Sequence, residues 1–201
     1  MSEKQTNKKD TPSARERIIA AAWDLFHEHG LDGTSVDDIL KASDTGKSQF
    51  YHYFKSKEGV IHELLQMAYH MIKNGETHFQ PIDSWEDFTS WMDASIDKLE
   101  EYGCSRACPI GQISCQISDD DELLRQDIKL IFEAMKDYPK AFFIKLQAQD
   151  ELPKDVDVDN LAAMCIASMQ GGAMLAKVNR DKDSFQNINN HLVTYIRSLT
   201  K

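Results

Sequence analysis

Residues that interrupt helices are scarce in this sequence, and so are long apolar runs. The 201 residues include nine glycines and five prolines, and no segment shows the strict apolar–polar alternation of a half-buried strand. No apolar run approaches the roughly 18 residues needed to cross a bilayer. The first ten residues are polar and lack the apolar core of a secretory signal. These absences favour an all-α, cytoplasmic protein.

Cysteine is scarce as well. The chain has four cysteines, Cys104, Cys108, Cys115 and Cys165, which in a cytoplasmic protein are expected to be reduced thiols rather than a disulfide framework. Cys104 and Cys108 form a CxxxC pair, but no second pair lies at the spacing of a zinc site. Glycine-rich phosphate loops, nucleophile elbows and metal motifs are also absent. We therefore expect no metal, no cofactor and no enzymatic activity.

Basic residues are fewer than acidic ones in this sequence. The chain carries 23 Lys and Arg against 33 Asp and Glu, a net charge of −10, which disfavours a non-specific nucleic-acid binder because such binding depends on neutralising phosphates. The deficit is uneven. Residues 1–60 hold nine basic and ten acidic residues, whereas residues 61–201 hold 14 and 23. Any DNA contact is therefore predicted to lie within the first 60 residues.

What the sequence does contain is helical periodicity along most of its length. Ser13 is a suitable cap for the first helix and Gly30 a suitable end. Pro139 is expected to kink or divide the helix that contains it. The first helix is expected at about 13–29. A short second helix starts at Thr34 or Ser35 and ends at a break at 43–45. Further helices are expected at about 46–53, 56–78, 84–102, 109–117, 120–149, 158–179 and 184–199.

The segment 34–57 has the parts of a helix-turn-helix, in which the second helix enters the major groove of DNA. Tyr51, His52 and Tyr53 cannot all be buried, because three adjacent residues span about 200° of a helix. The alternative, a helix edge packed on the core, accounts for Phe50 and Phe54 but leaves this aromatic run unexplained. Apolar residues that would hold the two helices together are Val36, Ile39, Leu40, Phe50 and Phe54.

The same region resembles the signature of TetR-family regulators over about residues 14–64, without insertion. The matching residues are Ile18-Ile19-Ala20-Ala21-Ala22, Leu25-Phe26, Gly30, Thr34-Ser35-Val36, Ile39 and Phe50-Tyr51-His52-Tyr53-Phe54-Lys55-Ser56-Lys57-Glu58. The turn departs from the family's usual Ala-Gly-Val-Ser, because Asp44 stands where glycine is usual. Asp can adopt the left-handed conformation that glycine supplies, so we expect the turn to be retained. Ser48 also replaces a frequent glycine.

Residues 1–11 are polar and are expected to form a flexible arm. The resemblance implies a DNA-binding head at 12–55 and a helical ligand-binding and dimerisation domain at 56–201. It implies a homodimer that binds operator DNA, most simply a repressor released by a small-molecule inducer. The DNA contacts it implies are Thr34 and Ser35 with phosphate, Lys47, Ser48 and Gln49 with bases, Tyr51 and His52 with backbone or bases, and Tyr53 and Lys57 with phosphate.

The body is rich in adaptable side chains. Seven of the eight methionines follow residue 66, together with several aromatic residues, and Met fills irregular spaces around cavities. Two interpretations stay open: an ordinary core, or a partly apolar ligand pocket. Candidate ligand-binding or sensor residues are Cys108, Trp91, Tyr102, Gln112, Met135, Met169 and Lys177.

Residues 103–111 resemble the Cys-Pro element that begins the sixth helix in one TetR subgroup. Cys108 precedes Pro109, a favoured first helical residue, so its sulfur is expected at a helix N-terminus, where Arg106 adds positive charge. The related layout places Lys177 near this thiol. Cys108 is thus either a small apolar residue lining the pocket or a sensor of oxidants and electrophiles.

The last two helices are the expected dimer interface, a four-helix bundle about a two-fold axis. Gly171 and Gly172 in mid-helix lower stability unless close packing compensates. The two-fold axis would place the recognition helices roughly 34–36 Å apart, in successive major grooves. Predicted interface residues are Leu161, Ser168, Gly171, Gly172, Leu175, Leu192, Tyr195 and Ile196.

Overall fold

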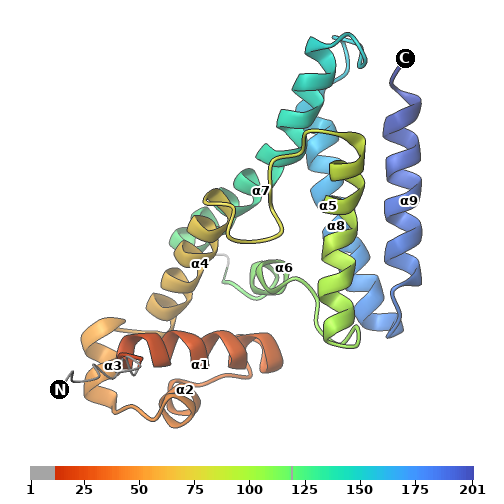
Figure 1. Ribbon diagram of the computed structural model, residues 1–201. Helices are drawn as coiled ribbons and strands as arrows, with labels where there is room; N and C mark the ends of the chain where they lie inside the picture. Colours follow the sequence, from red (N-terminus) through yellow and green to blue (C-terminus); the bar gives the residue numbers. More distant parts are fainter. Residues whose placement is uncertain (1–11, 119) are drawn as a thin grey trace, which may run out of the picture. The chain divides into compact units, whose positions relative to one another are not determined.

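The computed structural model describes residues 12–118 and 120–201, and within them every regular element is an α-helix, which confirms the all-α class (Figure 1). The helices are α1 (Ala14–His29), α2 (Val36–Ser43), α3 (Lys47–Tyr53), α4 (Lys57–Lys73), α5 (Trp85–Glu101), α6 (Pro109–Ser114), α7 (Glu122–Ala148), α8 (Val158–Asn179) and α9 (Asp183–Ser198). The arm predicted at 1–11 lies outside the described residues. The chain forms two compact units that meet between Glu63 and Leu64, inside α4.

In the first unit, α1 packs on α2 and α3. The Ser13 side chain accepts a hydrogen bond from the backbone of Glu16, whose carboxylate accepts one from the Ser13 backbone, so a capping box starts α1. Gly30, with φ of 75°, ends the helix, as predicted. The core of this unit contains Ile18, Ala22, Phe26, Ile39 and Phe50, all buried.

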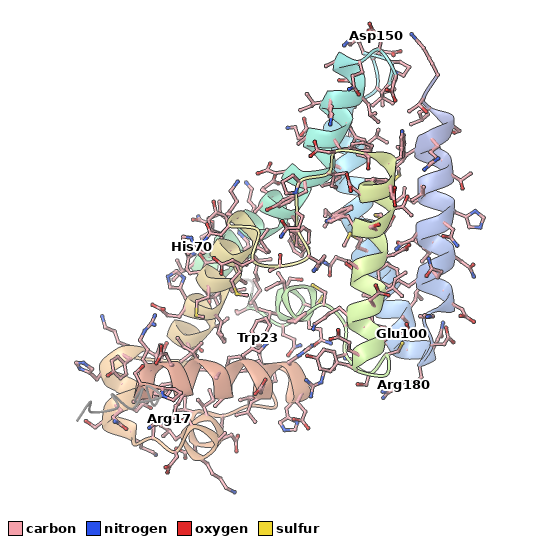
Figure 2. All side chains as sticks on the ribbon, in the orientation of Figure 1. Arg17, Trp23, His70, Glu100, Asp150 and Arg180 are labelled. Carbon is pink, nitrogen blue, oxygen red and sulfur yellow. The ribbon has the colours of Figure 1, made fainter. Side chains whose placement is uncertain are left out.

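In the second unit, α8 packs against α7 and α9, and α5 packs against α8 and α9. Figure 2 shows Glu100, on α5, and Arg180, just after α8, at one end of this unit, and Asp150, after α7, at the other. The core is aromatic and aliphatic because each helix turns an apolar face inward. Its largest fully buried side chains include Phe88, Met92, Ile131, Phe142, Phe143 and Phe185.

Helix α8 is long and apolar enough to span a membrane by length and composition alone. Core helices of soluble proteins pass the same test, so the match is weak evidence for a membrane segment. One side of α8 is buried against α7 and α9, through Ala162, Cys165 and Met169 among others. This packing explains the composition of α8 without a bilayer.

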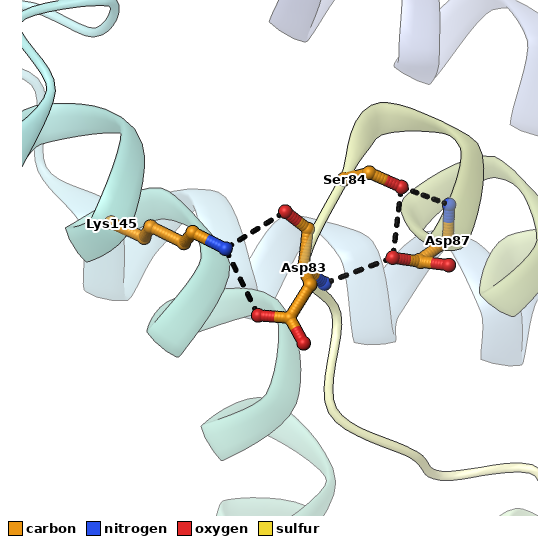
Figure 3. A network of polar contacts seen from close by, with 4 residues as sticks. All are labelled: Asp83, Ser84, Asp87 and Lys145. Carbon is orange, nitrogen blue, oxygen red and sulfur yellow. Dashed lines mark hydrogen bonds and ion pairs between the residues drawn. The ribbon is translucent and has the colours of Figure 1, made fainter.

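A polar network joins the start of α5 to α7 (Figure 3). Ser84 caps α5, accepting a hydrogen bond from the backbone of Asp87 and donating one to its carboxylate at 2.8 Å. The Asp83 backbone donates to the same carboxylate at 3.1 Å. Lys145 on α7 donates to both the carbonyl and the carboxylate of Asp83 at 2.9 Å. The residues before α5 are therefore held against α7.

Two predicted helix ends differ from the structure, and one expected break is absent from it. Helix α4 ends at Lys73 rather than near residue 78, because Gly75 takes a left-handed φ of 67° that closes the helix. Helix α6 ends at Ser114 rather than 117. Helix α7 is not divided at Pro139, which is buried inside it. Proline removes one backbone donor, and the burial of Phe142 and Phe143 on the next turn keeps the helix continuous.

Candidate functional site

The turn between α2 and α3 keeps its geometry despite its unusual sequence. Asp44 is left-handed, with φ of 48° and ψ of 53°, as predicted from the tolerance of Asp for this conformation. The Thr45 backbone donates to the Leu40 carbonyl at 3.1 Å, and the Ser43 and Thr45 hydroxyls lie 2.7 Å apart. The three residues therefore form a compact polar turn.

Arg17, labelled in Figure 2, holds this turn from α1. Its Nε donates to the Ser43 carbonyl at 3.0 Å and its Nη2 to the Asp44 carbonyl at 3.3 Å. These bonds fix the angle between α2 and α3 through a residue that the sequence reasoning missed. Nothing in the sequence marks Arg17, because its partners are backbone carbonyls 26 and 27 residues away.

Helix α2 is capped by Ser35, whose side chain accepts from the Asp38 backbone at 3.2 Å while the Asp38 carboxylate accepts from the Ser35 backbone at 2.9 Å. Hydrogen bonds from the Ser35 hydroxyl and backbone lower the pKa of Asp38. Thr34 differs from the expectation of a phosphate contact. Its side chain is 1% exposed, and its hydroxyl donates to the Gly30 carbonyl at 2.9 Å, so it joins α1 to α2 instead.

Helix α3 presents a polar and aromatic surface. Phe50 is fully buried and packs on Phe54, with ring centroids 5.8 Å apart. Every other residue of α3 is exposed: Lys47, Ser48, Gln49, Tyr51, His52 and Tyr53. This is the burial pattern expected of a recognition helix that one aromatic residue anchors to the unit beneath it.

Two of these exposed residues make contacts that leave donors available. Gln49 accepts from the Gly46 backbone at 3.2 Å through Oε1, so both N–H groups of its amide remain for a ligand. Lys47 pairs with Asp37 at 3.1 Å, and both side chains are well exposed. Such exposed pairs contribute little to stability, so a phosphate is able to replace Asp37.

Lys57, at the start of α4, is half-buried. Its ammonium donates to the carbonyls of Leu31 at 2.8 Å and Thr34 at 3.3 Å. An ammonium has three donors, so one remains for a phosphate. The lysine therefore ties α4 to the segment between α1 and α2, a structural role that the sequence did not indicate.

The predicted ligand residues fall into two groups. Trp91, Gln112, Met135 and Met169 come from α5, α6, α7 and α8, and all but the half-buried Gln112 are buried. Tyr102 and Lys177 are exposed, because they follow the last buried turns of their helices. The Tyr102 ring lies beneath the guanidinium of Arg106 at 4.9 Å, on the surface of the unit rather than in its interior.

Two of the buried candidates carry unmet hydrogen-bond donors. Trp91 Nε1 and Gln112 Nε2 are buried and have no partner among the described residues. The Trp91 ring is enclosed by Phe79 and Phe88, each with its ring centroid 6.0 Å away. A buried donor without an acceptor is unfavourable by about 1–3 kcal/mol. A bound molecule that accepts a hydrogen bond from either N–H group would remove this cost.

Cys108 is the N-cap of α6 and Pro109 is its first helical residue, as predicted. Its side chain is half-buried. The α8 residue beside this segment is Gln170, since a Cβ added to Gly111 would lie 2.3 Å from Gln170 Oε1 and 3.8 Å from Cys108 Cβ. Lys177 is seven residues further along α8, about 10 Å by helical rise.

The other thiols differ in access. Cys104 and Cys165 are buried and Cys115 is exposed. Burial raises the pKa of Cys165 to about 12, and burial is also the main cause of the raised pKa of Cys104. Burial therefore disfavours thiolate formation at Cys104 and Cys165.

The predicted dimer residues also separate by exposure. Leu175 and Tyr195 are exposed, and Ser168 and Gly171 are half-buried. The remaining four are core residues of their own chain, which corrects their assignment to an interface: Leu161, Gly172, Leu192 and Ile196. Met174 and Val178 on α8 are 59% and 74% exposed.

A clamped helix-turn-helix with an exposed recognition helix, followed by a helical body, defines a DNA-binding regulator of transcription. Family models agree over most of the chain: residues 18–64 match the bacterial regulatory proteins of the tetR family, and residues 87–192 match the tetracyclin repressor-like C-terminal domain. The chain belongs to the TetR family of transcriptional regulators.

Individual relatives are also regulators rather than enzymes. A Lactococcus lactis HTH-type transcriptional regulator in the lacX 3′ region is 30% identical, covering 84% of this chain and 86% of the relative. The HTH-type transcriptional repressor DhaR of Mycobacterium sp. strain GP1 is 27% identical, covering 84% and 85%. Among solved structures, reduced Escherichia coli NemR shares the fold with a TM-score of 0.80 at 19% identity, covering 94% of this chain and 97% of that one.

Proposed function

We propose that this regulator is a cytoplasmic homodimeric repressor that binds operator DNA with residues 12–55 and a small-molecule inducer with residues 56–201. The observation that carries the proposal is the surface of α3, where all residues except the anchor Phe50 are exposed. The DNA-contacting residues are Ser35, Lys47, Ser48, Gln49, Tyr51, His52, Tyr53 and Lys57.

Roles within this surface follow from the donors each residue offers. The amide of Gln49 suits the paired acceptor and donor on the major-groove edge of adenine. Tyr53 and the remaining donor of Lys57 suit phosphate oxygens, which set the position of the head without reading sequence. We assign Lys47 to phosphate as well, in place of the base contact that the resemblance implies, because its ammonium already pairs with an exposed carboxylate, that of Asp37. Ser35 lies at the N-cap of α2, where backbone N–H groups favour an anion.

The inducer is proposed to occupy the interior of the second unit near Trp91 and Gln112. Both offer N–H donors without partners, so an inducer that accepts hydrogen bonds gains more there than an apolar one. Met135 and Met169 supply adaptable apolar surface. The inducer relieves repression only to the extent that it binds the non-DNA-binding conformation more tightly than the DNA-binding one.

The dimer is proposed to form through the exposed stripe of α8 and the adjoining face of α9. Gly171, Leu175 and Val178 are spaced by three or four residues and so share one side of α8, and Tyr195 supplies an exposed ring on α9. Large exposed apolar side chains in one patch are typical of protein interfaces.

A second candidate mode is thiol sensing at Cys108. The observation that favours it is that Cys108 is half-buried at a helix N-cap while Cys104 and Cys165 are buried. In this mode a Cys108→Ser variant binds DNA normally but is no longer released by diamide. Release of the variant and the native protein to the same extent would contradict it.

The proposal is tested by fluorescence anisotropy of a labelled duplex from the region upstream of the regulator's own gene. Tight binding that resists random competitor DNA supports sequence-specific repression, and competition by random DNA at equal concentration contradicts it. Adding diamide and then thiol to the same sample separates the two modes. Reversible release supports the cysteine switch, whereas unchanged binding supports a non-covalent inducer.

A further inference from the structure

A polar groove lies between α5 and α9, apart from every residue assigned above. It is open to solvent, has a volume of about 390 Å³ and is lined by Thr89 and Asp93 on α5 and by Asn189, Asn190, Thr194 and Arg197 on α9, among others. Val193 and Arg197 lie on the opposite face of α9 from Tyr195, because each is rotated about 160° from it. The proposed dimer surface therefore leaves the Arg197 side of the groove open.

The two ends of the groove carry opposite charges. Neither Asp93 nor Arg197 forms an ion pair within residues 12–118 and 120–201. Arg197 lies over the Trp85 ring, 4.8 Å from its centroid, which holds the guanidinium in place and leaves its N–H edges available. Trp85 and Asp93 are eight residues apart on α5, about 12 Å along the helix axis.

The Asp93 end offers acceptors. Asn189 is 1% exposed, and its Nδ2 donates to the Met92 carbonyl at 2.8 Å. That bond fixes the amide, and its Oδ1 is left buried without a partner in the part of the chain that the structure describes. Among the described residues, the Asp93 carboxylate accepts from Gln186 Nε2 alone, at 3.1 Å. Thr89 donates its hydroxyl proton to the Trp85 carbonyl at 2.9 Å, so towards the groove it too presents an acceptor.

An acceptor-rich anionic end suits an ammonium group, and a guanidinium suits a carboxylate. We propose that the α5–α9 groove binds a small zwitterion, with its ammonium at Asp93 and Asn189 and its carboxylate at Arg197. Trp85 and Asp93 stand about 12 Å apart along α5, so the groove favours a ligand whose two charges lie at opposite ends of a carbon chain. An ω-amino acid such as 5-aminopentanoate has this form, whereas an α-amino acid carries both charges on one carbon.

The test is calorimetric titration of the full-length protein with 5-aminopentanoate, and with pentanoate and pentylamine, which each keep one charge on the same carbon chain. We expect 5-aminopentanoate to bind and each singly charged analogue to bind at least about tenfold more weakly, because a charged hydrogen bond is lost. Equal binding of pentylamine, or no binding of 5-aminopentanoate, would overturn the proposal without any substitution being made.

Variants then locate the site. Asp93→Asn and Arg197→Gln should each weaken 5-aminopentanoate binding by about tenfold or more. Asp155→Asn, which makes the same charge change on the exposed loop after α7, should leave it unchanged. Neither Asp93 nor Arg197 is buried, so the variants should fold, and their helical content is checked by circular dichroism. Binding that survives both groove substitutions overturns the assignment.

Discussion

Gly172 lies so close to Phe185 that a Cβ added to the glycine would be 2.2 Å from the phenylalanine ring. This contact brings α8 and α9 together at a fully buried aromatic side chain. The adjacent Gly171 has nothing within 4 Å of the same ideal position. Two neighbouring glycines thus have different physical reasons to be there: one fits the core of its own chain, and the other lies on the half-buried side of α8.

Gly172→Ala should therefore lower the free energy of unfolding by about 1–3 kcal/mol, because the added methyl overfills the α8–α9 contact. Gly171→Ala should lower it less than Gly172→Ala does, since alanine favours the helix and the added methyl meets no atom of the described residues of the same chain within 4 Å. Urea unfolding at one protein concentration measures both. Equal effects of the two substitutions would show that α8 and α9 pack less closely than the structure has them.

The dimer proposal predicts that Leu175→Glu produces monomers that no longer bind operator tightly, because a charge would be buried in an apolar interface. Sedimentation velocity measures the association state, and anisotropy measures DNA binding. The control is Ile144→Glu on α7, another exposed apolar residue, which should leave the dimer intact. A dimer that persists in the Leu175 variant would move the interface away from this stripe of α8.

Within the DNA surface, Gln49→Ala should weaken operator binding by about 1–3 kcal/mol and relax preference at one base position. Lys47→Ala should instead weaken operator and random DNA alike and lower the dependence of binding on salt. Titrations at two salt concentrations with both duplexes distinguish the two patterns. Thr34→Val, which changes a buried hydroxyl, should reduce stability rather than the salt dependence of DNA binding.

Asp87 predicts how the start of α5 responds to acid. Its pKa lies below the usual 3.8, chiefly because the Ser84 hydroxyl donates to the carboxylate, with a further bond from the Asp83 backbone. A lowered pKa contributes stability above the unfolded value, and that contribution is lost as pH falls through the folded one. The melting temperature of Asp87→Asn should fall below that of the native protein at pH 7, and the two should converge below about pH 3.8. If the difference in melting temperature were the same at every pH, the effect of the substitution would come from side-chain shape rather than from the carboxylate charge.

The DNA-binding head was more predictable from the sequence than the body, for a physical reason. Its helices are short and their ends are set by local groups, such as the Ser35 cap, the left-handed Asp44 and the anchor Phe50. Such signals lie within a few residues of the structure they produce. The predictions failed where a partner lies far along the chain, as for Arg17 on the turn, or where a polar side chain turns inward, as Thr34 does.

In the body, periodicity identified the apolar residues of α8 and α9 but not which neighbour they face. Leu161 and Leu192 have the same spacing whether they meet their own chain or a second copy, and the structure places both in their own core. Exposure selects Met174 and Val178 instead. Composition and family resemblance indicate Trp91 and Gln112 as ligand residues, but their unmet donors are seen only in the packed structure.

Because Cys104 and Cys165 are buried, the rate at which they react with a thiol reagent reports how often the helices around them separate. In the native state a thiol reagent has ready access only to Cys108 and Cys115, because the other two are enclosed and their pKa values are raised. Alkylation of the enclosed pair therefore requires the helices around them to separate. The rate of alkylation of the third and fourth cysteines therefore measures how often residues 56–201 open. A ligand bound inside this domain would lower that rate.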